Sequence, residues 1–281
     1  MTKLILQGLN LDHPAALRVA ALAGSALPQA IGTHAYRCNQ ADISPEQKAR
    51  IEAECLTAQI DCALLSENLR LSDFKLVAMD MDSTLITIEC IDEIADMQGL
   101  KPQVAEITES AMRGEIEFTE SLTRRVALLE GLDATALQRV YDERLRLSPG
   151  AEAMLGAVQA AGLKTLLVSG GFTFFTDRIK ARLKLDYTHA NTLEIVGGKL
   201  TGKVIGTIVD ADEKKRMLEQ VCTELGLTTR QAIAMGDGAN DLKMLGVAGL
   251  SLAFRAKPVV RAQADVALNF VGLDGLLTLF K

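Results

Sequence analysis

The stretch LVAMDMDSTLI, residues 76–86, begins apolar and becomes acidic within a few residues. This pattern predicts a buried strand that carries two carboxylates, Asp80 and Asp82, at its C-terminal end. A strand that stayed extended would point both side chains to one face, whereas a strand that ended here would let the backbone turn between them. In either case two carboxylates meet in a small volume, so a cation or a proton must offset their repulsion.

Two interpretations of this acidic pair are open at this point. The acids could cap a following helix, which is the simpler explanation for an isolated pair of aspartates. Alternatively, a nucleophilic carboxylate, an acid–base partner and a Mg²⁺ ion would together explain why two acids are placed side by side. The rest of the chain has to distinguish these interpretations.

The composition limits what kind of protein this is. The 281 residues are enough for about two domains of roughly 150 residues each. The net charge is −6 and no block of Lys or Arg occurs, so nucleic acid is not an expected partner. No apolar run approaches the roughly 18 residues that span a bilayer, and the N-terminus becomes polar too soon for a signal peptide. We therefore expect a cytoplasmic protein without a membrane partner.

Cysteine and histidine give no sign of a metal framework. The five cysteines are odd in number, form no C-x-x-C pair and lie among apolar residues, so reduced thiols are expected. The three histidines are scattered through the chain, which argues against a histidine-based triad or zinc site.

Residues 1–72 are predicted to form a small α/β unit that ends in the polar stretch 66–73. The predicted strands cover 4–9, 31–37 and 60–65, and the predicted helices cover 14–23 and 45–59. Ser44 is expected to cap the second helix, with Pro45 as its first residue. The pattern is compatible with a ferredoxin-like or ACT-like regulatory fold, although it is short of strands. A structural or dimerising appendage, which would make the protein a homodimer, is the alternative.

Residues 73–281 are predicted to form a larger α/β domain. Short apolar strands alternate with helices there, which implies a doubly wound parallel sheet. Residues 88–147 differ, because apolar residues recur in them only at helical spacing. The later strands are predicted at 163–168, 232–235, 250–254 and 266–268, with a β-hairpin at 192–209.

The helix boundaries of this domain are predicted from capping residues. Ser148 is the expected N-cap and Pro149 the first residue of a helix that stops at Gly162. Another helix is expected over 173–183. Asp212 is expected to cap a helix that ends at Gly226 and carries a lysine in its first turn.

Three strands of the predicted sheet end in polar residues, at 80–82, 169–171 and 237–241. Ligands of an open parallel sheet bind beyond the carboxyl ends of its strands. Ser169 and Gly170 offer a hydroxyl and a closely approachable N–H, which suit an anion, although a tight turn would also need glycine. One polar strand end would mean little, but three in one sheet are hard to explain by helix capping.

Charged residues complete this predicted phosphate site. Lys214 could neutralise phosphate charge and hold the nucleophile, whereas a solvated helix lysine is the ordinary alternative. Asp237 and Asp241 are oxygen ligands suited to Mg²⁺, and Asn240 can donate and accept hydrogen bonds beside them. The single G-x-G at 236–238 lacks the third glycine of a dinucleotide-binding loop, and its acids would repel a pyrophosphate.

These stretches resemble the four motifs of the haloacid dehalogenase (HAD) superfamily, in the family's order. The matching residues are Asp80-x-Asp82-x-Thr84, Ser169, Lys214 and Gly236-Asp237-Gly238-x-x-Asp241, so the resemblance covers about residues 76–270. It implies a Rossmann-like doubly wound parallel sheet with a helical cap, about residues 88–147, inserted after the first strand. It also implies that Asp80 attacks phosphorus and that Asp82 is the general acid–base.

The same resemblance implies how Mg²⁺ is bound. The ligands would be the Asp80 carboxylate, the Asp82 backbone carbonyl and Asp237, with Asp241 close by or acting through water. Ser169, Gly170, Lys214 and Asn240 would bind the substrate.

The cap segment resembles the phosphoserine phosphatase family. Glu89 matches a residue that holds the substrate ammonium, and Arg125 one that holds its carboxylate, for which a planar bidentate donor is suited. Met112 and Phe118 match residues that close over the substrate. From the residues alone, Glu89 would more simply be a helix surface acid, and Arg124 or Arg125 part of a solvated helix face.

The resemblance therefore implies hydrolysis of O-phospho-L-serine to L-serine and phosphate through an aspartyl-phosphate, the last step of L-serine biosynthesis. One alternative is a HAD phosphatase or phosphotransferase for another small phosphate, such as phosphohomoserine or phosphothreonine. A second is a catalytically inactive regulator that binds an amino acid through residues 1–72.

Overall fold

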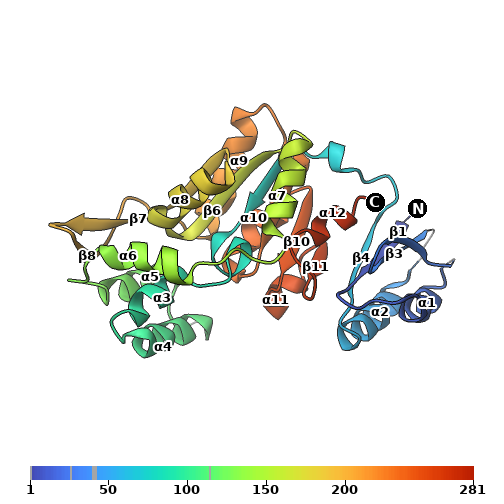
Figure 1. Ribbon diagram of the computed structural model, residues 1–281, viewed down its shortest axis with the longest axis horizontal. Coiled ribbons are helices and arrows are strands. Elements are labelled where there is room, and N and C mark those ends of the chain that lie inside the picture. Colours follow the sequence, from blue (N-terminus) through green and yellow to red (C-terminus); the bar gives the residue numbers. More distant parts are fainter. Residues whose placement is uncertain (1, 26, 40–42, 114) are drawn as a thin grey trace.

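A computed structural model describes residues 2–25, 27–39, 43–113 and 115–281, with Met112 described by its backbone alone. The strands in these ranges form two sheets, one of four strands and one of seven. Figure 1 shows the small sheet at the right, beside the larger sheet, and a group of helices in green at the lower left.

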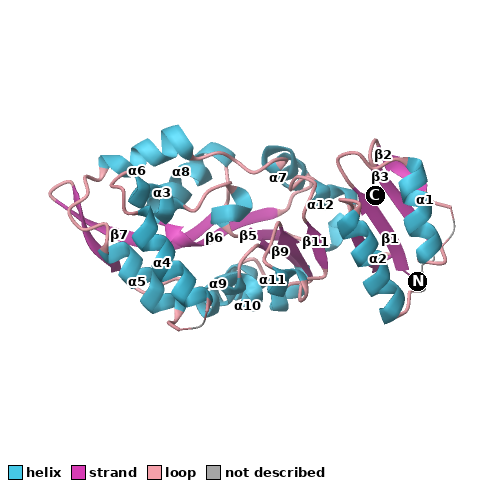
Figure 2. Ribbon diagram, turned by 90° about the horizontal axis from the view of Figure 1, so that it is seen from below, coloured by secondary structure: helices cyan, strands magenta, loops and turns pink. Residues whose placement is uncertain are grey.

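The N-terminal unit consists of β1 (Thr2–Gln7), α1 (His13–Leu22), β2 (Gln29–Gly32), β3 (Ala35–Asn39), α2 (Pro45–Thr57) and β4 (Asp61–Ser66). The strand order is β2-β3-β1-β4, and all neighbouring strands are antiparallel. This β-α-β-β-α-β succession is that of a ferredoxin-like unit. Leu4 and Leu6 of β1 pack with α1 and α2, whereas Ile5, on the opposite face, joins the core of the larger sheet. Figure 2 shows both helices beside the small sheet.

The prediction of a single strand over 31–37 is wrong. The segment is a hairpin in which β2 and β3 are joined by a turn at residues 33–34. β2 is short and mostly exposed, so it lacks the apolar alternation by which a strand is recognised. The predicted cap of α2 is confirmed, because Ser44 Oγ accepts a hydrogen bond from Gln47 N–H and Pro45 begins the helix.

The larger sheet has the strand order β11-β10-β9-β5-β6-β7-β8. The strands are β5 (Leu76–Met79), β6 (Lys164–Phe172), β7 (Tyr187–Val196), β8 (Lys199–Ile205), β9 (Ala232–Gly236), β10 (Leu250–Phe254) and β11 (Val266–Leu268). All neighbours are parallel except β7 and β8, which form the predicted hairpin. The predicted parallel α/β sheet is therefore confirmed. β5 lies in the middle and is buried throughout, which explains its apolar run.

Helices cover both faces of this sheet. The helices are α7 (Ala151–Ala160), α8 (Thr173–Leu183), α9 (Ala211–Glu224), α10 (Leu242–Val247), α11 (Pro258–Arg261) and α12 (Gly275–Thr278). Successive residues of β5 alternate between two cores. Val77 and Met79 pack with α7, α8 and α12, whereas Leu76 and Ala78 pack with α9, α10 and α11. Both faces of β5 are thereby closed, and only its carboxyl end is left to carry polar groups.

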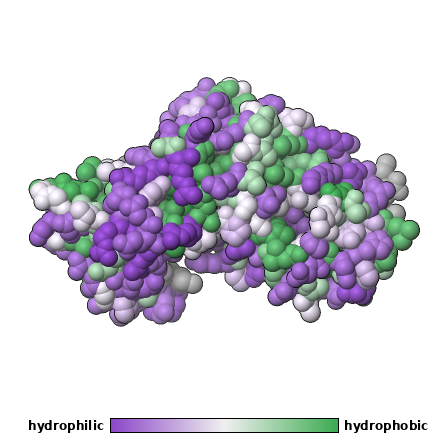
Figure 3. Space-filling view, in the orientation of Figure 1, coloured by the Kyte–Doolittle hydropathy of each residue, from purple (hydrophilic) through white to green (hydrophobic). Residues whose placement is uncertain are grey.

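Residues between β5 and α7 form the helices α3 (Cys90–Asp96), α4 (Lys101–Met112), α5 (Phe118–Ala127), α6 (Thr135–Arg139) and the turn η3 (Val140–Arg144). The helical character predicted for this segment is thus confirmed. These helices lie at the end of the molecule that carries the β7–β8 hairpin (Figure 1). Figure 3 shows green hydrophobic surface at that end, where Ile195, Val196 and Ile205 are exposed.

Two predicted helix caps are wrong. α7 begins at Ala151 rather than Pro149, because Gly150 adopts a left-handed φ of 77° where a Cβ would collide with Asp274. α9 is capped by Asp210 rather than Asp212, since Asp210 Oδ1 accepts the Glu213 N–H at 2.9 Å. The predicted helix ends at Gly162 and Gly226 are confirmed, and both glycines have positive φ.

None of the helices in the described parts of the chain has the length and apolar character of a membrane-spanning segment.

One buried carboxylate joins the two sheets. Asp61, the first residue of β4, accepts hydrogen bonds from the backbone N–H groups of Asn269, Phe270 and Val271 at 2.7 to 3.0 Å. These residues follow β11, and Asp61 is only 2% exposed. The side chain therefore anchors the N-terminal unit to the loop after the edge strand of the larger sheet.

We predict that Asp61→Ala lowers the free energy of unfolding by roughly 3 kcal/mol, because three backbone donors lose their acceptor. Urea denaturation measures this loss. Asp12→Ala is a suitable control, since Asp12 caps α1 at an exposed position and its loss is expected to cost about 1 kcal/mol. Equal losses in the two variants would contradict the anchoring role.

Candidate active site

The backbone turns directly after β5. Asp80 still belongs to the sheet, since its N–H donates to the Met235 carbonyl at 3.0 Å. Ser83 then adopts a left-handed φ of 56°, and a hydrogen bond from Ile86 N–H to the Met81 carbonyl closes the turn. Of the two geometries open from the sequence, the structure has the turn. Asp80 therefore lies at the strand end, and the Asp82 side chain lies on the turn that follows.

Lys214, in the first turn of α9, is buried between two carboxylates. Its Nζ lies 2.8 Å from Asp80 Oδ1 and 2.7 Å from Asp241 Oδ1, and the side chain is 0% exposed. Burial alone would lower the pKa of Lys214, but the two carboxylates outweigh it and raise the pKa above the ordinary value. The next residue, Lys215, lies at the surface near Glu219. Lys214 is therefore not a solvated helix lysine.

Three carboxylates gather around this ammonium. Oxygens of Asp80, Asp237 and Asp241 lie within 4.8 Å of one another. Asp241 is held by the protein, because its Oδ2 accepts the N–H groups of Asp237 and Gly238 at 3.1 and 3.0 Å. A Cβ on Gly236 would collide with the Asp241 carboxylate, so the close approach needs glycine there.

The cluster carries more negative than positive charge. Burial raises the pKa of Asp80 well above its ordinary value, and Asp241 adds to the rise, although Lys214 opposes it. Burial also raises the pKa of Asp237 to about 7, again with a contribution from Asp241. Three carboxylates facing one ammonium leave a net charge of −2 when all are ionised. Hard oxygen donors with excess negative charge fit a cation such as Mg²⁺.

Asp82 faces the end of β6. Its Oδ1 accepts the Cys90 N–H at 3.3 Å, and a Cβ on Gly171 would lie 2.7 Å from its Oδ2. Burial raises the pKa of Asp82 to about 8, and the charge of Glu89 adds to the rise. Gly171 is therefore required for the close approach of Asp82 to β6.

The end of β6 is organised by two buried hydrogen-bonding side chains. Ser169 Oγ accepts the Gly171 N–H at 2.8 Å. Asn191, in the middle of β7, donates to the Gly170 carbonyl at 2.8 Å and accepts the Val209 N–H at 2.9 Å. Sequence reasoning missed Asn191, although a buried asparagine inside a strand is unusual enough to have signalled it.

The helices after β5 bring further predicted residues to this site. Phe118, the first residue of α5, lies against the end of β6, since its Cζ is 3.0 Å from the position of a Cβ on Gly170. Glu89 precedes α3 and accepts a 2.6 Å hydrogen bond from Ser83 Oγ. Thr84 Oγ1 donates to Asp237 Oδ1 at 3.2 Å.

The two neighbouring arginines of α5 have different surroundings. Arg124 pairs with Glu120 on the exposed side of the helix. Burial lowers the pKa of Arg125, while the carboxylates of Asp92, Glu89 and Asp82 oppose this effect. In the described residues Arg125 makes only a 3.4 Å hydrogen bond, to its own helix at Ser121. Arg125, rather than Arg124, therefore faces the acidic side of the site.

Two predicted site residues are less well defined. Asn240 lies against Gly238, and its side chain makes no hydrogen bond within the parts of the chain that are described. The side chain of Met112 lies outside the described residues. The structure thus brings together Asp80, Asp82, Glu89, Phe118, Arg125, Ser169, Gly170, Lys214, Asp237 and Asp241.

Comparison with known proteins agrees with this architecture. The family model of haloacid dehalogenase-like hydrolases matches residues 74–249. A phosphoserine phosphatase of Polaromonas is 60% identical over 219 residues, which are 76% of this chain and 93% of that protein.

Solved structures extend the similarity over the whole chain. A HAD family hydrolase of Salmonella enterica serovar Typhi has a TM-score of 0.91 at 34% identity, over 100% of this chain and 99% of that chain. A probable phosphoserine phosphatase of Vibrio cholerae has a TM-score of 0.82 at 35% identity, over 99% of this chain and 86% of that chain. The chain therefore belongs to the haloacid dehalogenase-like hydrolases.

Proposed function

We propose that this protein is a phosphoserine phosphatase that hydrolyses O-phospho-L-serine to L-serine and phosphate. One structural observation is the main support for this proposal. A buried lysine–carboxylate cluster lies at the end of β5, and Glu89 and Arg125 reach the same site from the helices between β5 and α7. The 60% identity to a phosphoserine phosphatase supports the same activity.

The proposed nucleophile is Asp80. Its Oδ1 is engaged twice, by the Met81 N–H at 2.7 Å and by Lys214 at 2.8 Å. Its Oδ2 is left to form the bond to phosphorus while the bond from phosphorus to the serine oxygen breaks. This step produces an aspartyl-phosphate on Asp80 and frees serine.

Asp82 is the proposed general acid and base. With a pKa raised to about 8, it holds a proton at neutral pH and can give it to the departing serine oxygen. The carboxylate then takes a proton from the water that attacks phosphorus, so the aspartyl-phosphate is hydrolysed and both aspartates return to their starting states.

Mg²⁺ is the proposed cofactor, and the acidic cluster supports it. Asp80, the Asp82 carbonyl and Asp237 would hold the ion, with Asp241 close by or acting through water. Both oxygens of Asp241 already accept hydrogen bonds from the protein, which favours the indirect role. When bound, Mg²⁺ would draw charge from the phosphoryl group.

The remaining proposed contacts divide between phosphate and serine. Ser169, the Gly170 N–H, Lys214 and Asn240 would bind phosphate. Glu89 would bind the serine ammonium and Arg125 its carboxylate, for which a planar guanidinium is suited. We assign residues 88–147 to a cap, in which Phe118 and Met112 would close over the substrate.

We further propose that residues 1–72 are a separate domain of ACT-like type attached to the catalytic domain, residues 73–281. The ferredoxin-like strand order supports this assignment. The cytoplasmic location and the homodimer stay predictions from the sequence.

The first test is phosphate release from O-phospho-L-serine, O-phospho-L-threonine and p-nitrophenyl phosphate, each with Mg²⁺ and with EDTA. We expect a strong preference for phosphoserine that EDTA abolishes and added Mg²⁺ restores. Activity on the aryl phosphate alone would preserve the Asp80 chemistry but overturn the assignments of Glu89 and Arg125. Full activity in EDTA would overturn the metal requirement.

Asp80→Asn should lower turnover by roughly 10⁴-fold or more and prevent phosphorylation of the protein, because an amide is a poor nucleophile. Turnover and the acid-quenched phosphoprotein measure the two effects. Asp212→Asn is the control, since Asp212 lies at the surface beside Lys243. A phosphorylated, active Asp80→Asn protein would contradict the mechanism.

Arg125→Ala should lower kcat/KM for phosphoserine about 100-fold, or about 2.7 kcal/mol, while p-nitrophenyl phosphate is much less affected. The aryl phosphate has no carboxylate to lose. Arg124→Ala is the matched control, because it removes the neighbouring exposed arginine of α5. Equal losses for both substrates would show that Arg125 does not bind the carboxylate.

A further inference from the structure

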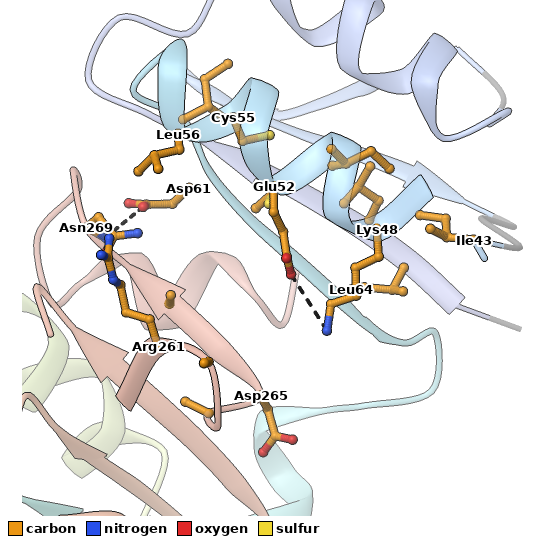
Figure 4. A pocket seen from close by; sticks show the side chains of 17 residues that line it. Ile43, Lys48, Glu52, Cys55, Leu56, Asp61, Leu64, Arg261, Asp265 and Asn269 are labelled. Carbon is orange, nitrogen blue, oxygen red and sulfur yellow. Dashed lines mark hydrogen bonds and ion pairs between the residues drawn. The ribbon is translucent and has the colours of Figure 1, made fainter. Parts of the chain in front are cut away.

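A pocket lies away from the acidic cluster, between the N-terminal unit and the larger sheet. Its volume is about 420 Å³, which is within the range of small-molecule sites. Side chains of α2 and β4 form one wall, and residues around α11 and β11 form the other. Figure 4 shows Arg261 and Asn269 on the core side, opposite Lys48, Glu52 and Cys55 of α2.

The wall formed by the N-terminal unit is mainly apolar. Ile51, Cys55, Ile60 and Leu64 line it, with Leu56 exposed at 52%. Such a surface favours the apolar part of a ligand, because contact with it removes apolar area from water.

The charged groups of the pocket differ in how well they are satisfied. Asp61 accepts three backbone N–H groups, and Asp265 accepts both the N–H and the hydroxyl of Ser251. Glu52 Oε1 lies 3.7 Å from Lys48 Nζ, and both residues belong to α2. Arg261 is half-buried and has no hydrogen bond or ion pair of its side chain within the described residues. Among the charged side chains of the pocket, the Arg261 guanidinium alone has no partner within the described residues, and it lies across the pocket from the apolar wall.

We infer that this pocket binds a small carboxylate with an apolar body. Arg261 would hold the carboxylate through two parallel hydrogen bonds, a geometry that a guanidinium provides and an ammonium does not. The apolar body would lie against Leu56, Cys62 and Leu64, the residues of the apolar wall that keep exposed surface. Neither aspartate of the pocket forms an ion pair with Arg261 within the described residues; both keep their negative charge and are held instead by neutral N–H and hydroxyl donors.

The pocket is connected to the acidic cluster through α11. Arg261 is the last residue of this four-residue helix. At the other end, the Lys257 N–H donates to the Asp237 carbonyl at 3.0 Å. A ligand that moves Arg261 can therefore shift the loop that carries Asp237, and we expect occupancy to change kcat or KM.

The probe for binding is hexanoate, and hexan-1-ol and hexylamine are its uncharged and cationic analogues. Binding of each compound to the full-length protein is measured by saturation-transfer NMR. Hexanoate should bind at least about tenfold more tightly than either analogue, and Arg261→Gln should remove this preference. Arg139→Gln is the matched control, since Arg139 pairs with Glu143 on an exposed helix far along the chain. Absence of hexanoate binding at millimolar concentration, or equal binding to Arg261→Gln, would overturn the site.

Binding must also be separated from the acidic cluster, where Arg125 could attract a carboxylate. Hexanoate binding should survive Arg125→Ala, and loss of binding in that variant would overturn the assignment to this pocket. The binding measurements need no phosphatase activity, so their outcome is independent of the proposed function. Unchanged kcat and KM at saturating hexanoate would overturn the coupling through α11.

Cys62 provides a second readout that does not depend on Arg261. It lines the pocket and is partly exposed, whereas the other four cysteines are buried. Hexanoate should slow the alkylation of Cys62 by iodoacetamide in the full-length protein. Mass spectrometry of the Cys62 peptide, after digestion of the alkylated protein, measures the rate. Leu56→Trp, at an exposed position on the rim, should give the same protection without ligand. An alkylation rate that hexanoate leaves unchanged would overturn the proposed position of the ligand.

Discussion

The structure depends on one buried charge, the ammonium of Lys214. Its contacts with Asp80 and Asp241, at 2.8 and 2.7 Å, join the end of β5, the first turn of α9 and the loop after β9. Transferring an ion out of water costs several kcal/mol, and removal of one partner from such a pair costs about 3–5 kcal/mol. These three segments are therefore held in one arrangement, although they are far apart in the chain. The arrangement still leaves excess negative charge, so the protein gains from binding a cation there.

The backbone turn after Asp80 also fixes the start of the helical segment that follows β5. Ser83 adopts a left-handed φ of 56°, which costs a non-glycine residue on the order of 1 kcal/mol. Its hydroxyl donates a 2.6 Å hydrogen bond to Glu89, which helps to offset this cost. The turn that follows the nucleophile candidate thus also fixes a residue proposed to recognise the substrate. Gly171 lets Asp82 approach the neighbouring strand β6, since a Cβ there would lie 2.7 Å from Asp82 Oδ2.

Much of this could be predicted from the sequence, because the signals are local. The apolar run before Asp80 indicated the central strand, and polar residues after three strands indicated the edge at which they meet. Asn191 was missed because its contacts, to Gly170 and Val209, are set by tertiary structure rather than by any local pattern. The β2–β3 hairpin was missed because β2 is a short exposed edge strand. The N-caps of α7 and α9, Gly150 and Asp210, were not predicted because several neighbouring residues are acceptable caps and packing decides among them.

The two charged groups proposed to recognise serine, Glu89 and Arg125, form no ion pair within the described residues. Arg125 is partly buried among carboxylates, yet in the described residues its only hydrogen bond is a long one, to the Ser121 carbonyl. Glu89 is held by the neutral hydroxyl of Ser83 rather than by a cation. A zwitterionic head group would supply the missing partner of each, whereas a neutral alcohol would leave both unpaired. Since an unpaired partly buried charge is costly, the proposed site would penalise phosphates that lack an amino-acid head group. Selectivity would then arise from the charges that the protein leaves without a partner, as well as from the contacts that the substrate makes.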